Sequence, residues 1–494
     1  MKKHNYIKYI LTLISLAGMT ISCSDLLDQD PEDRLVVGNF YKTEAEAQAA
    51  VNGVYDRLQN GMYERTLSML TDLVTDDMKN GLGMSNADLQ DLEFLRHSSE
   101  NSFVRAIWQQ CYDGIARANT AIQALPGVSM NEERKNQYIG EVRFLRGLFY
   151  FNLVRLYGDV PLLRKLESLE DAYKPRSPIA DVYALIVEDL AFAENNLPAT
   201  YQSKDIGRAT SGAAKILLGK VYLTREQWQL AADKLEEVID DAGVYGYALH
   251  DNFRDNWEVA TENGSEMVFS VQFAEPPSNG NQLMQAIAPN YSMPGGGIPG
   301  VTQHWEADIP TEDLFSIFDD ADERKAASFN KDYVSPKDGL IYSSTIENFY
   351  KYWEQGEKFC ANSDINFHVL RYADAILMYA EALNELNLTT DAETQINVIR
   401  ERAFNDDAHN YNGLDKVTLR DMIRHERRLE FTHEAQRFFD LARWGTYIDV
   451  MIAHSAAEPQ KEDIAINISS RNMLFPIPQR ERDLNPKLEQ NTGF

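Results

Sequence analysis

The sequence predicts a mainly α-helical protein, and three observations lead to that fold class. Apolar residues recur every three or four positions along several long segments, which is the period of one helix face. Small and aromatic residues recur within these segments at the spacing of paired helices. Between roughly residues 245 and 365 this periodicity fades. We therefore expect a platform of about four irregular helix pairs and an irregular, loop-rich half that contains short strands.

Two segments near the N-terminus have the pattern of core-facing helices. Residues 43–61 begin with Thr43 and Glu46, which form a capping box. Residues 136–162 contain a longer helix that ends at Gly158. The apolar stripes are Ala47, Ala50, Val51, Val54 and Leu58 in the first segment, and Tyr138, Val142, Leu145, Phe149, Leu153 and Leu156 in the second. Each helix should bury one face against the core.

Two later segments each have the pattern of a helix pair. The helical pattern of residues 209–243 is interrupted near Thr224–Glu226, and that of residues 371–403 is interrupted near Leu388–Asp391. Their small and aromatic residues have the spacing of a tetratricopeptide hairpin, in which small residues let two helices approach. These residues are Gly219, Tyr222 and Ala231 in the first segment, and Ala380, Leu383 and Ala392 in the second. Gly147 with Tyr150, and Gly53 with Tyr55, mark the first helices of two further pairs. Such pairs can stack into a continuous core.

The stretch between the third and fourth pairs has a different character. EMVFSVQF at 266–273 alternates like a short strand, and the glycine-rich MPGGGIPG follows at 293–300. Tyrosine and tryptophan are frequent here, which argues against disorder. Long irregular segments inside a folded domain are usually functional.

Composition excludes several classes of function. The chain has 494 residues, 44% of them hydrophobic, so most of it should fold into a globular body. Its 48 basic and 76 acidic residues give a formal net charge of −28. This charge repels phosphates and anionic lipid head groups, so we expect no nucleic-acid partner.

The N-terminus has the layout of an export signal. Residues 1–22 place three lysines before an apolar stretch, 9–21, that is too short to span a bilayer. Cys23 follows directly, as in a bacterial lipobox, where the thiol becomes a lipid thioether. We expect residues 1–22 to be removed, Cys23 to be lipidated and residues 23–35 to form a tether. An ordinary signal with an incidental cysteine is the alternative.

The sequence contains no recognisable motif for catalysis or metal binding. His425 and His433 each lack the second histidine of a zinc-protease helix. The glycine-rich stretch lacks the Gly-Lys-Ser/Thr of a phosphate-binding loop, and no Gly-x-Ser-x-Gly elbow occurs. Cys111 and Cys360 have no metal-like spacing, and the sequence leaves open whether they pair or remain buried thiols. We therefore expect that the protein is not an enzyme and that it has no cofactor and no metal site.

Charged side chains are embedded in the apolar helical segments. They are Arg143, Arg146, Arg427, Arg428, Glu430, Arg437, Asp440 and Arg443. A substrate clamp is one interpretation, but ion pairs that fix how the helices stack are favoured.

Several blocks of the sequence resemble one known family. GEVRFLRGLFYFNLVRLYGDVPL, GRATSGAAKILLGKVYL, RYADAILMYAEALNE, ERRLEFTHEAQRFFDLARWG and LFPIPQRERDLNPKLEQNTGF look like successive signature blocks of the SusD/RagB family of outer-membrane lipoproteins. NFYKTEAEAQAAVNGVY and SCSDLLD fit as well, and the blocks occur in family order from Cys23 to Phe494.

The resemblance implies a fold and a function. Residues 36–494 would form a single domain, a tetratricopeptide-like platform with a ligand-binding insertion at roughly 245–365. The lipidated protein would be displayed on the outer membrane, touching the bilayer through its lipid anchor only. It would act as a hinged lid that captures a glycan and delivers it to a SusC-like TonB-dependent barrel. Alternatives are a peptide-binding RagB-like uptake lipoprotein and, less favoured, a surface glycoside hydrolase.

Aromatic and amide side chains are the expected contacts to a glycan. An aromatic ring can cover the C–H face of a sugar while polar groups take its hydroxyls. Trp305, Tyr291 and His304 flank the glycine-rich stretch, and Asn80 and Asn86 lie in the loop DMKNGLGMSNADLQ. The alternative for the rings is that they pack the loops down.

Overall fold

The structure is a computed structural model, and it describes most of the chain. The described residues are 41–59, 61–165, 171, 173–274, 280–458 and 462–494. The predicted signal peptide (1–22), Cys23 and the tether (23–35) lie outside the described residues. Within the described ranges, no helix is both long and apolar enough to cross a membrane.

The two N-terminal helices form as the sequence predicts. In α2 (Glu44–Gln59) the Glu46 amide donates to Thr43 Oγ1 at 3.3 Å, and the Thr43 amide donates to Glu46 Oε2 at 2.8 Å, which completes the capping box. The predicted stripe of α6 (Glu132–Tyr157) is buried throughout, and that of α2 is buried except for the half-buried Ala50. Gly158, with φ 74°, ends α6.

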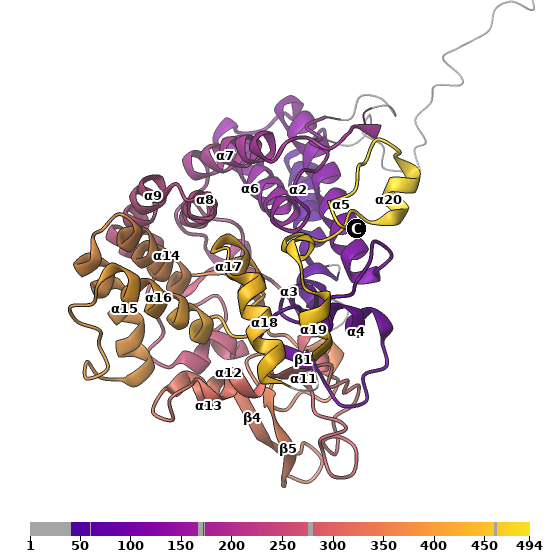
Figure 1. The fold of residues 1–494 in the computed structure, drawn as a ribbon. Helices are drawn as coiled ribbons and strands as arrows, with labels where there is room; N and C mark the ends of the chain where they lie inside the picture. Colours follow the sequence, from indigo (N-terminus) through magenta and orange to yellow (C-terminus); the bar gives the residue numbers. More distant parts are fainter. Residues whose placement is uncertain (1–40, 60, 166–170, 172, 275–279, 459–461) are drawn as a thin grey trace, which may run out of the picture.

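Four helix pairs form the platform, which confirms the predicted fold class. The pairs are α2 with α5 (Ser102–Ala124), α6 with α7 (Ile179–Asn196), α8 (Ser211–Thr224) with α9 (Trp228–Asp240), and α14 (Tyr372–Glu385) with α15 (Thr389–Phe404). Consecutive pairs touch through α5 and α6, α7 and α8, and α9 and α14, so the pairs stack side by side (Figure 1). This stacking buries a continuous core.

The turns within the last two pairs are close to where the sequence places them. Glu226 (φ 55°) lies between α8 and α9, within the predicted break, and Asn387 (φ 65°) lies between α14 and α15, one residue before the predicted break begins. A left-handed residue cannot continue a right-handed helix. Across the first turn, a Cβ on Gly219 would meet Leu235 Cγ at 2.8 Å, so the small residue does allow the close approach.

Buried ion pairs join the helices, as the sequence favours. Arg146 of α6 donates to both carboxylate oxygens of Asp189 of α7 at 2.7 Å. In α16 (Lys416–Glu430), Glu430 accepts from Arg371 at 2.9 Å, Arg402 at 2.7 Å and Arg324 at 3.1 Å. This cluster ties the platform to the irregular half. Cys111 and Cys360 are both free and buried, so they do not pair.

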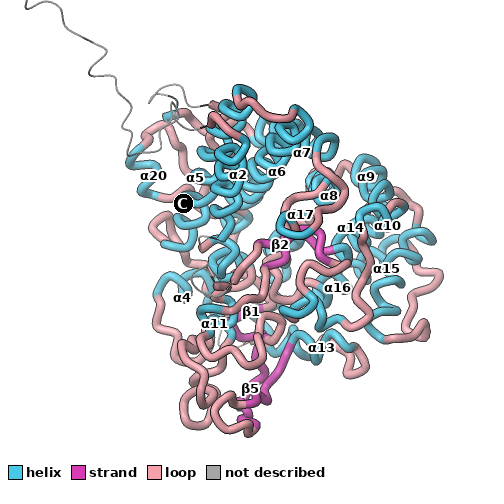
Figure 2. Tube along the Cα trace, turned by 180° about the vertical axis from the view of Figure 1, so that it is seen from behind, coloured by secondary structure: helices cyan, strands magenta, loops and turns pink. Residues whose placement is uncertain are grey.

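The irregular half contains three two-stranded antiparallel ribbons and several short helices (Figure 2). The ribbons are β1 (Met78–Asn80) with β3 (Asp308–Pro310), β2 (Met267–Val271) with β6 (Phe367–Arg371), and β4 (Phe329–Val334) with β5 (Ile341–Phe349). The short helices before α14 and outside the four pairs are α3 (Leu67–Thr71), α4 (Ala87–Glu93), α10 (Ala242–Tyr245), α11 (Leu283–Ile287), α12 (Glu312–Ser316) and α13 (Glu323–Ser328), of which α10 packs on α9. The predicted strand at 266–273 is confirmed as β2, whereas the β4–β5 hairpin was not predicted.

The C-terminal segment returns to the N-terminal helices. Its helices are α17 (Arg437–Arg443), α18 (Tyr447–Ala457), α19 (Glu462–Asn467) and α20 (Gln479–Leu484). The Phe475 amide donates to Leu156 O at 2.7 Å, and the Gln479 amide donates to Ser99 O at 2.9 Å. Figure 1 accordingly shows α20 beside α5. The end of the chain therefore helps to hold the first two helix pairs together.

Candidate functional site

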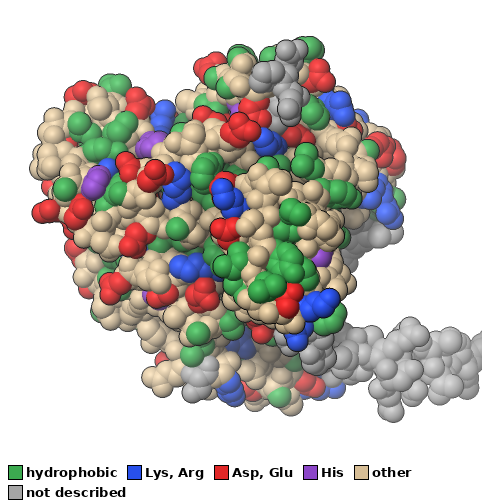
Figure 3. Space-filling view, turned by 90° about the horizontal axis from the view of Figure 1, so that it is seen from below, with side chains coloured by type: hydrophobic (Ala, Val, Ile, Leu, Met, Phe, Trp, Pro, Cys, Tyr) green, Lys and Arg blue, Asp and Glu red, His purple; other side chains and the backbone are tan. Residues whose placement is uncertain are grey.

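A pocket of about 980 Å³, partly open to solvent, lies at the end of the molecule that carries α4 and α11. Its lining residues are Arg65, Met69, Gly83, Met84, Ser85, Asn86, Leu89, Phe103, Asn290, Tyr291, His304 and Trp305. Four of the five predicted ligand contacts are therefore together. We call the pocket lined by these residues the aromatic pocket. Figure 3 views the molecule from below and shows hydrophobic side chains gathered in patches between acidic and basic ones.

Trp305 presents part of its ring to the aromatic pocket. Its side chain is 38% exposed, and the guanidinium of Arg65 lies 4.5 Å from the ring centroid, a cation–π contact. Partial burial lowers the pKa of Arg65, although its charge persists at any physiological pH. Arg65 belongs to a single π-helical turn, Met62–Thr66, and such turns occur often at functional sites. The arginine covers part of the indole and leaves the rest of its surface open to the pocket.

Tyr291 is the most exposed ring of the pocket, at 60%. It lies against Gly83, where a Cβ would meet the ring at 2.6 Å, and Gly83 has φ 83°. The buried Glu306 carboxylate fixes the loop beneath the ring by accepting from the amides of Asn290, Tyr291 and Ser292 at 3.3, 2.6 and 3.0 Å. The loop that carries Tyr291 is therefore held by its backbone, which leaves the ring to solvent.

His304 borders the same pocket, next to the glycine-rich stretch. A Cβ on Gly297 would meet its ring at 2.6 Å, so the glycine makes room for the imidazole. Burial lowers the pKa of His304, so the ring is neutral at pH 7. Gln303 (φ 66°) and Glu306 (φ 48°) both have left-handed backbones on either side of His304 and Trp305. Strained backbone of this kind often clusters at ligand sites.

The two predicted asparagines separate in the structure. Asn86 lines the aromatic pocket and also caps α4, because its Oδ1 accepts from the amides of Asp88 at 2.9 Å and Leu89 at 3.3 Å. Asn80 lies in β1 and lines a neighbouring pocket instead. Its carboxamide donates to Glu93 Oε2 at 2.6 Å.

Ion pairs hold the two segments that form the pocket. The β1–β3 ribbon brings the loop after β1 beside the segment that carries Trp305. Arg428 of α16 donates to Asp77, just before β1, at 2.7 Å and to Asp313, just after β3, at 2.8 Å, so it joins the two segments at one end of the ribbon. From the hairpin, the Thr345 amide donates to Ser292 O at 2.9 Å. The pocket is thus fixed to the platform on one side and to β5 on the other.

Sequence reasoning missed Arg65 and Glu306. Arg65 lies more than 200 positions before Trp305, and Glu306 is one of 76 acidic residues, so no local pattern selects either of them. Their roles come from tertiary contacts alone. The signal that was available is the glycine-rich stretch, which pointed to the loop that borders the aromatic pocket.

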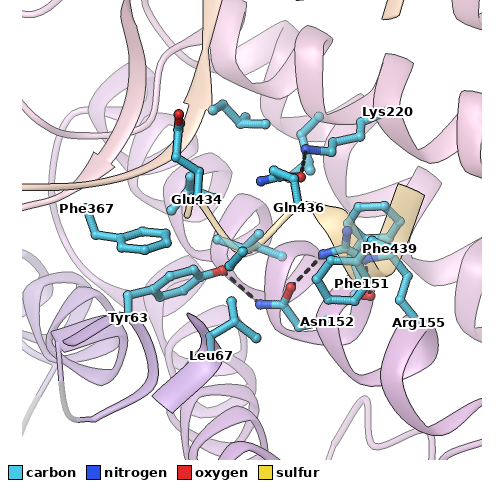
Figure 4. A pocket seen from close by; sticks show the side chains of 15 residues that line it. Tyr63, Leu67, Phe151, Asn152, Arg155, Lys220, Phe367, Glu434, Gln436 and Phe439 are labelled. Atoms are coloured by element: carbon cyan, nitrogen blue, oxygen red, sulfur yellow. Dashed lines mark hydrogen bonds between the residues drawn. The ribbon is translucent and has the colours of Figure 1, made fainter. Parts of the chain in front are cut away.

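A smaller pocket of about 340 Å³ lies between α6 and α8 of the platform, β6 and the segment 434–439 (Figure 4). Asn152 donates to the Tyr63 hydroxyl and accepts from Arg155, both at 2.8 Å. Lys220 donates to Gln436 Oε1, also at 2.8 Å. Because these polar groups satisfy one another, we regard this pocket as structural and not as a binding site.

Among the described residues there is no cluster of three histidine, cysteine or acidic side chains that could hold a metal ion.

Family models cover most of the chain. The model described as "SusD family" matches residues 265–494, and the model described as "Starch-binding associating with outer membrane" matches residues 25–223. The chain belongs to the SusD family. The first match spans most of the irregular half, the fourth helix pair and the last helices. The second spans the first two helix pairs and nearly all of α8.

Relatives of this SusD-family chain align over nearly its whole length. A SusD-like protein of Formosa agariphila is 28% identical over 510 residues, covering 98% of this chain and 99% of the relative. A solved structure of a laminarin-binding SusD-like protein is 27% identical with a TM-score of 0.77, covering 92% of this chain and all of the other. A SusD superfamily protein from Parabacteroides distasonis is 26% identical with a TM-score of 0.79, covering 93% of this chain and all of the other.

Proposed function

We propose that this protein binds a glycan, an oligo- or polysaccharide, in the aromatic pocket. The observation that carries the proposal is the convergence of two exposed rings, Tyr291 and Trp305, on one pocket with the polar side chains of Asn86 and His304. Rings can cover sugar C–H faces while the polar groups take hydroxyls. The similarity to a laminarin-binding SusD-like protein supports the same ligand class.

We propose that binding, not hydrolysis, is the activity. A glycosidase uses two carboxyl groups on either side of the scissile bond. The described residues that line the aromatic pocket include no aspartate or glutamate. The nearby Glu306 carboxylate is occupied by three backbone amides and the Ser292 hydroxyl. Shortened oligosaccharides released by the purified protein would instead favour the hydrolase alternative.

The test of the site is affinity gel electrophoresis through a panel of polysaccharides that includes laminarin. We expect Trp305→Ala and Tyr291→Ala to abolish the retardation of the wild-type protein, because each removes a ring that covers a sugar face. Tyr173→Ala is the matched control, since Tyr173 is an exposed ring (39%) that does not line the pocket. Retention that does not change in the two pocket variants would remove the aromatic pocket from the proposal.

We also propose that the protein works at the outer membrane, held by a lipid on Cys23 after removal of residues 1–22. The description of the matching family, which names association with the outer membrane, supports the location. Several acyl chains, each contributing about 0.8 kcal/mol per buried CH₂, would hold the protein firmly. Cys23→Ser should release a folded protein into the soluble fraction. Continued membrane association of this variant would contradict the anchor.

The proposed partner is a SusC-like TonB-dependent barrel, on which residues 36–494, a single domain, would act as a hinged lid that delivers the glycan. Family membership supports this partner. Native protein solubilised in mild detergent should run as a complex with a large barrel. Migration as a lone chain would contradict the pairing. The second candidate is a RagB-like lipoprotein that carries peptides. It predicts that Trp305→Ala leaves the retention of the protein by polysaccharides unchanged.

A further inference from the structure

A second, larger pocket lies beside the aromatic pocket. It encloses about 1310 Å³, partly open to solvent. Segments 79–94 and 304–312 contribute to both pockets: Leu82 lines the second while its neighbour Gly83 lines the first. The remaining walls come from α12, from the β4–β5 hairpin and from Glu458 after α18. We call it the acidic pocket.

Two buried oxygens in the acidic pocket have no hydrogen-bond donor among the described residues. Asn80 directs its NH₂ to Glu93, so its Oδ1 is left without a partner in the described part of the chain. Glu458 Oε2 lies 3.8 Å from Lys79 Nζ, while its Oε1 has no partner within the same ranges. A buried polar atom without a partner costs about 1–3 kcal/mol. Both atoms are acceptors, so the group that satisfies them must be a donor.

The charge of this pocket favours the same kind of ligand. Its charged lining residues are Glu93, Glu312, Glu347 and Glu458, against Lys79 and Lys331. Lys331 lies 3.3 Å from Glu347, so part of the positive charge is already paired. The excess of carboxylates attracts a cation and repels an anion. The pocket also has an apolar wall, formed by Leu82, Phe94, Ile309, Pro310, Phe315 and Ile346.

We propose that the acidic pocket is a second saccharide site, which accepts a neutral or amino sugar unit and rejects an anionic one. Hydroxyl and ammonium groups of the sugar donate to Asn80 Oδ1 and Glu458 Oε1, and its C–H face lies on the apolar wall. This proposal takes its ligand class from the proposed function. Because adjacent residues of one loop line the two pockets, one oligosaccharide can occupy both.

The test uses the mature protein with Trp305→Ala, so that the aromatic pocket contributes little. Glucosamine, glucose and glucuronic acid are titrated separately, and binding is followed by saturation-transfer NMR. We expect glucosamine to bind at least tenfold more tightly than glucuronic acid, with glucose between them. A Trp305→Ala protein that binds none of the three sugars, or binds glucuronic acid as well as glucosamine, overturns the proposal.

A second variant locates the bound sugar. Glu458→Gln keeps the size of the side chain and removes its charge, so we expect it to weaken glucosamine binding at least fivefold. Glu237→Gln is the control, because it removes one carboxylate from the surface of α9, outside the pocket. Asn80→Leu should weaken glucosamine and glucose alike. Glucosamine binding that is unchanged by Glu458→Gln overturns the proposal.

The two sites can fail independently. If polysaccharide retention survives Trp305→Ala and is lost in Glu458→Gln, the acidic pocket stands and the aromatic pocket fails. If retention is lost only with Trp305→Ala, the aromatic pocket stands alone.

Discussion

At the scale of single residues, the site depends on glycines that make room for rings. Gly83 and Gly297 each have a positive φ, and a Cβ on either would collide with a ring of the pocket, Tyr291 or His304. A side chain at either position would therefore be unfavourable for two reasons, because it would strain the backbone and would displace the ring. Other glycines of the same stretch, such as Gly295 (φ 96°), face open space and would cost only the strain.

This contrast gives a matched pair of variants. Gly83→Ala should push Tyr291 out of position and weaken glycan binding about tenfold, which corresponds to about 1.4 kcal/mol. Gly295→Ala carries a similar backbone strain and should leave binding within about twofold, or about 0.4 kcal/mol. Calorimetric titration of both variants with the same oligosaccharide measures the difference. Equal losses in the two variants would show that strain, and not the position of the ring, controls affinity.

At the scale of elements, small residues at the contact set how closely neighbouring helices pack. A Cβ on Gly114 of α5 would meet the ring of Phe149 in α6 at 2.4 Å, which is closer than any side chain can tolerate. Phe149 is itself fully buried, so the ring has no space into which to move. The sequence singled out Gly53, Gly147 and Gly219 for this role. Only a Cβ on Gly219 would collide with a neighbour, at 2.8 Å, whereas the nearest atoms lie 3.4 Å from the Cβ position of Gly147 and 3.7 Å from that of Gly53.

Gly114→Ala should therefore destabilise the protein, by about 1–3 kcal/mol from overpacking, despite the better helix propensity of alanine. Gly53→Ala, in α2, gains the same propensity without the collision and should be neutral or stabilised by up to about 1 kcal/mol. Chemical denaturation of the two variants compares their free energies of unfolding. A Gly114→Ala protein as stable as Gly53→Ala would mean that α5 and α6 can shift apart at little cost.

At the scale of the whole molecule, a buried charge cluster joins the platform to the irregular half. Glu430 of α16 is fully buried among Arg371, which ends β6, Arg402 of α15 and Arg324 of α13. Burial raises the pKa of Glu430, but the three arginine charges outweigh burial and hold its pKa below the ordinary range. Removal of one charge from such a cluster leaves the others uncompensated in a medium that solvates them poorly.

We expect Glu430→Gln to lower the free energy of unfolding by about 3 kcal/mol, as for a broken buried ion pair. Glu237→Gln removes a carboxylate that is 43% exposed and pairs with Lys215 and Lys234, so it should cost less than about 1 kcal/mol. Unfolding in urea, followed by circular dichroism, measures both. If the two variants lose the same small amount of stability, the buried cluster contributes no more than a surface pair.

The sequence by itself determined the features that arise from neighbouring residues. The capping box of α2, the stripes of α2 and α6, the end of α6 at Gly158 and the strand β2 all follow from local spacing. The glycine-rich stretch likewise marked the loops that carry Tyr291 and Trp305, whose role in binding stays a prediction. The periods of helices and strands are short-range properties, so they are readable without knowledge of the fold.

Only the tertiary structure decided which of these residues meet. The pairing of β1 with β3 joins segments about 230 positions apart, and it places Asn86 with Trp305 but Asn80 in the acidic pocket. Arg65 and Glu306 enter the site through similarly distant contacts. Long-range pairing depends on how whole surfaces pack, and no local spacing in the chain specifies it.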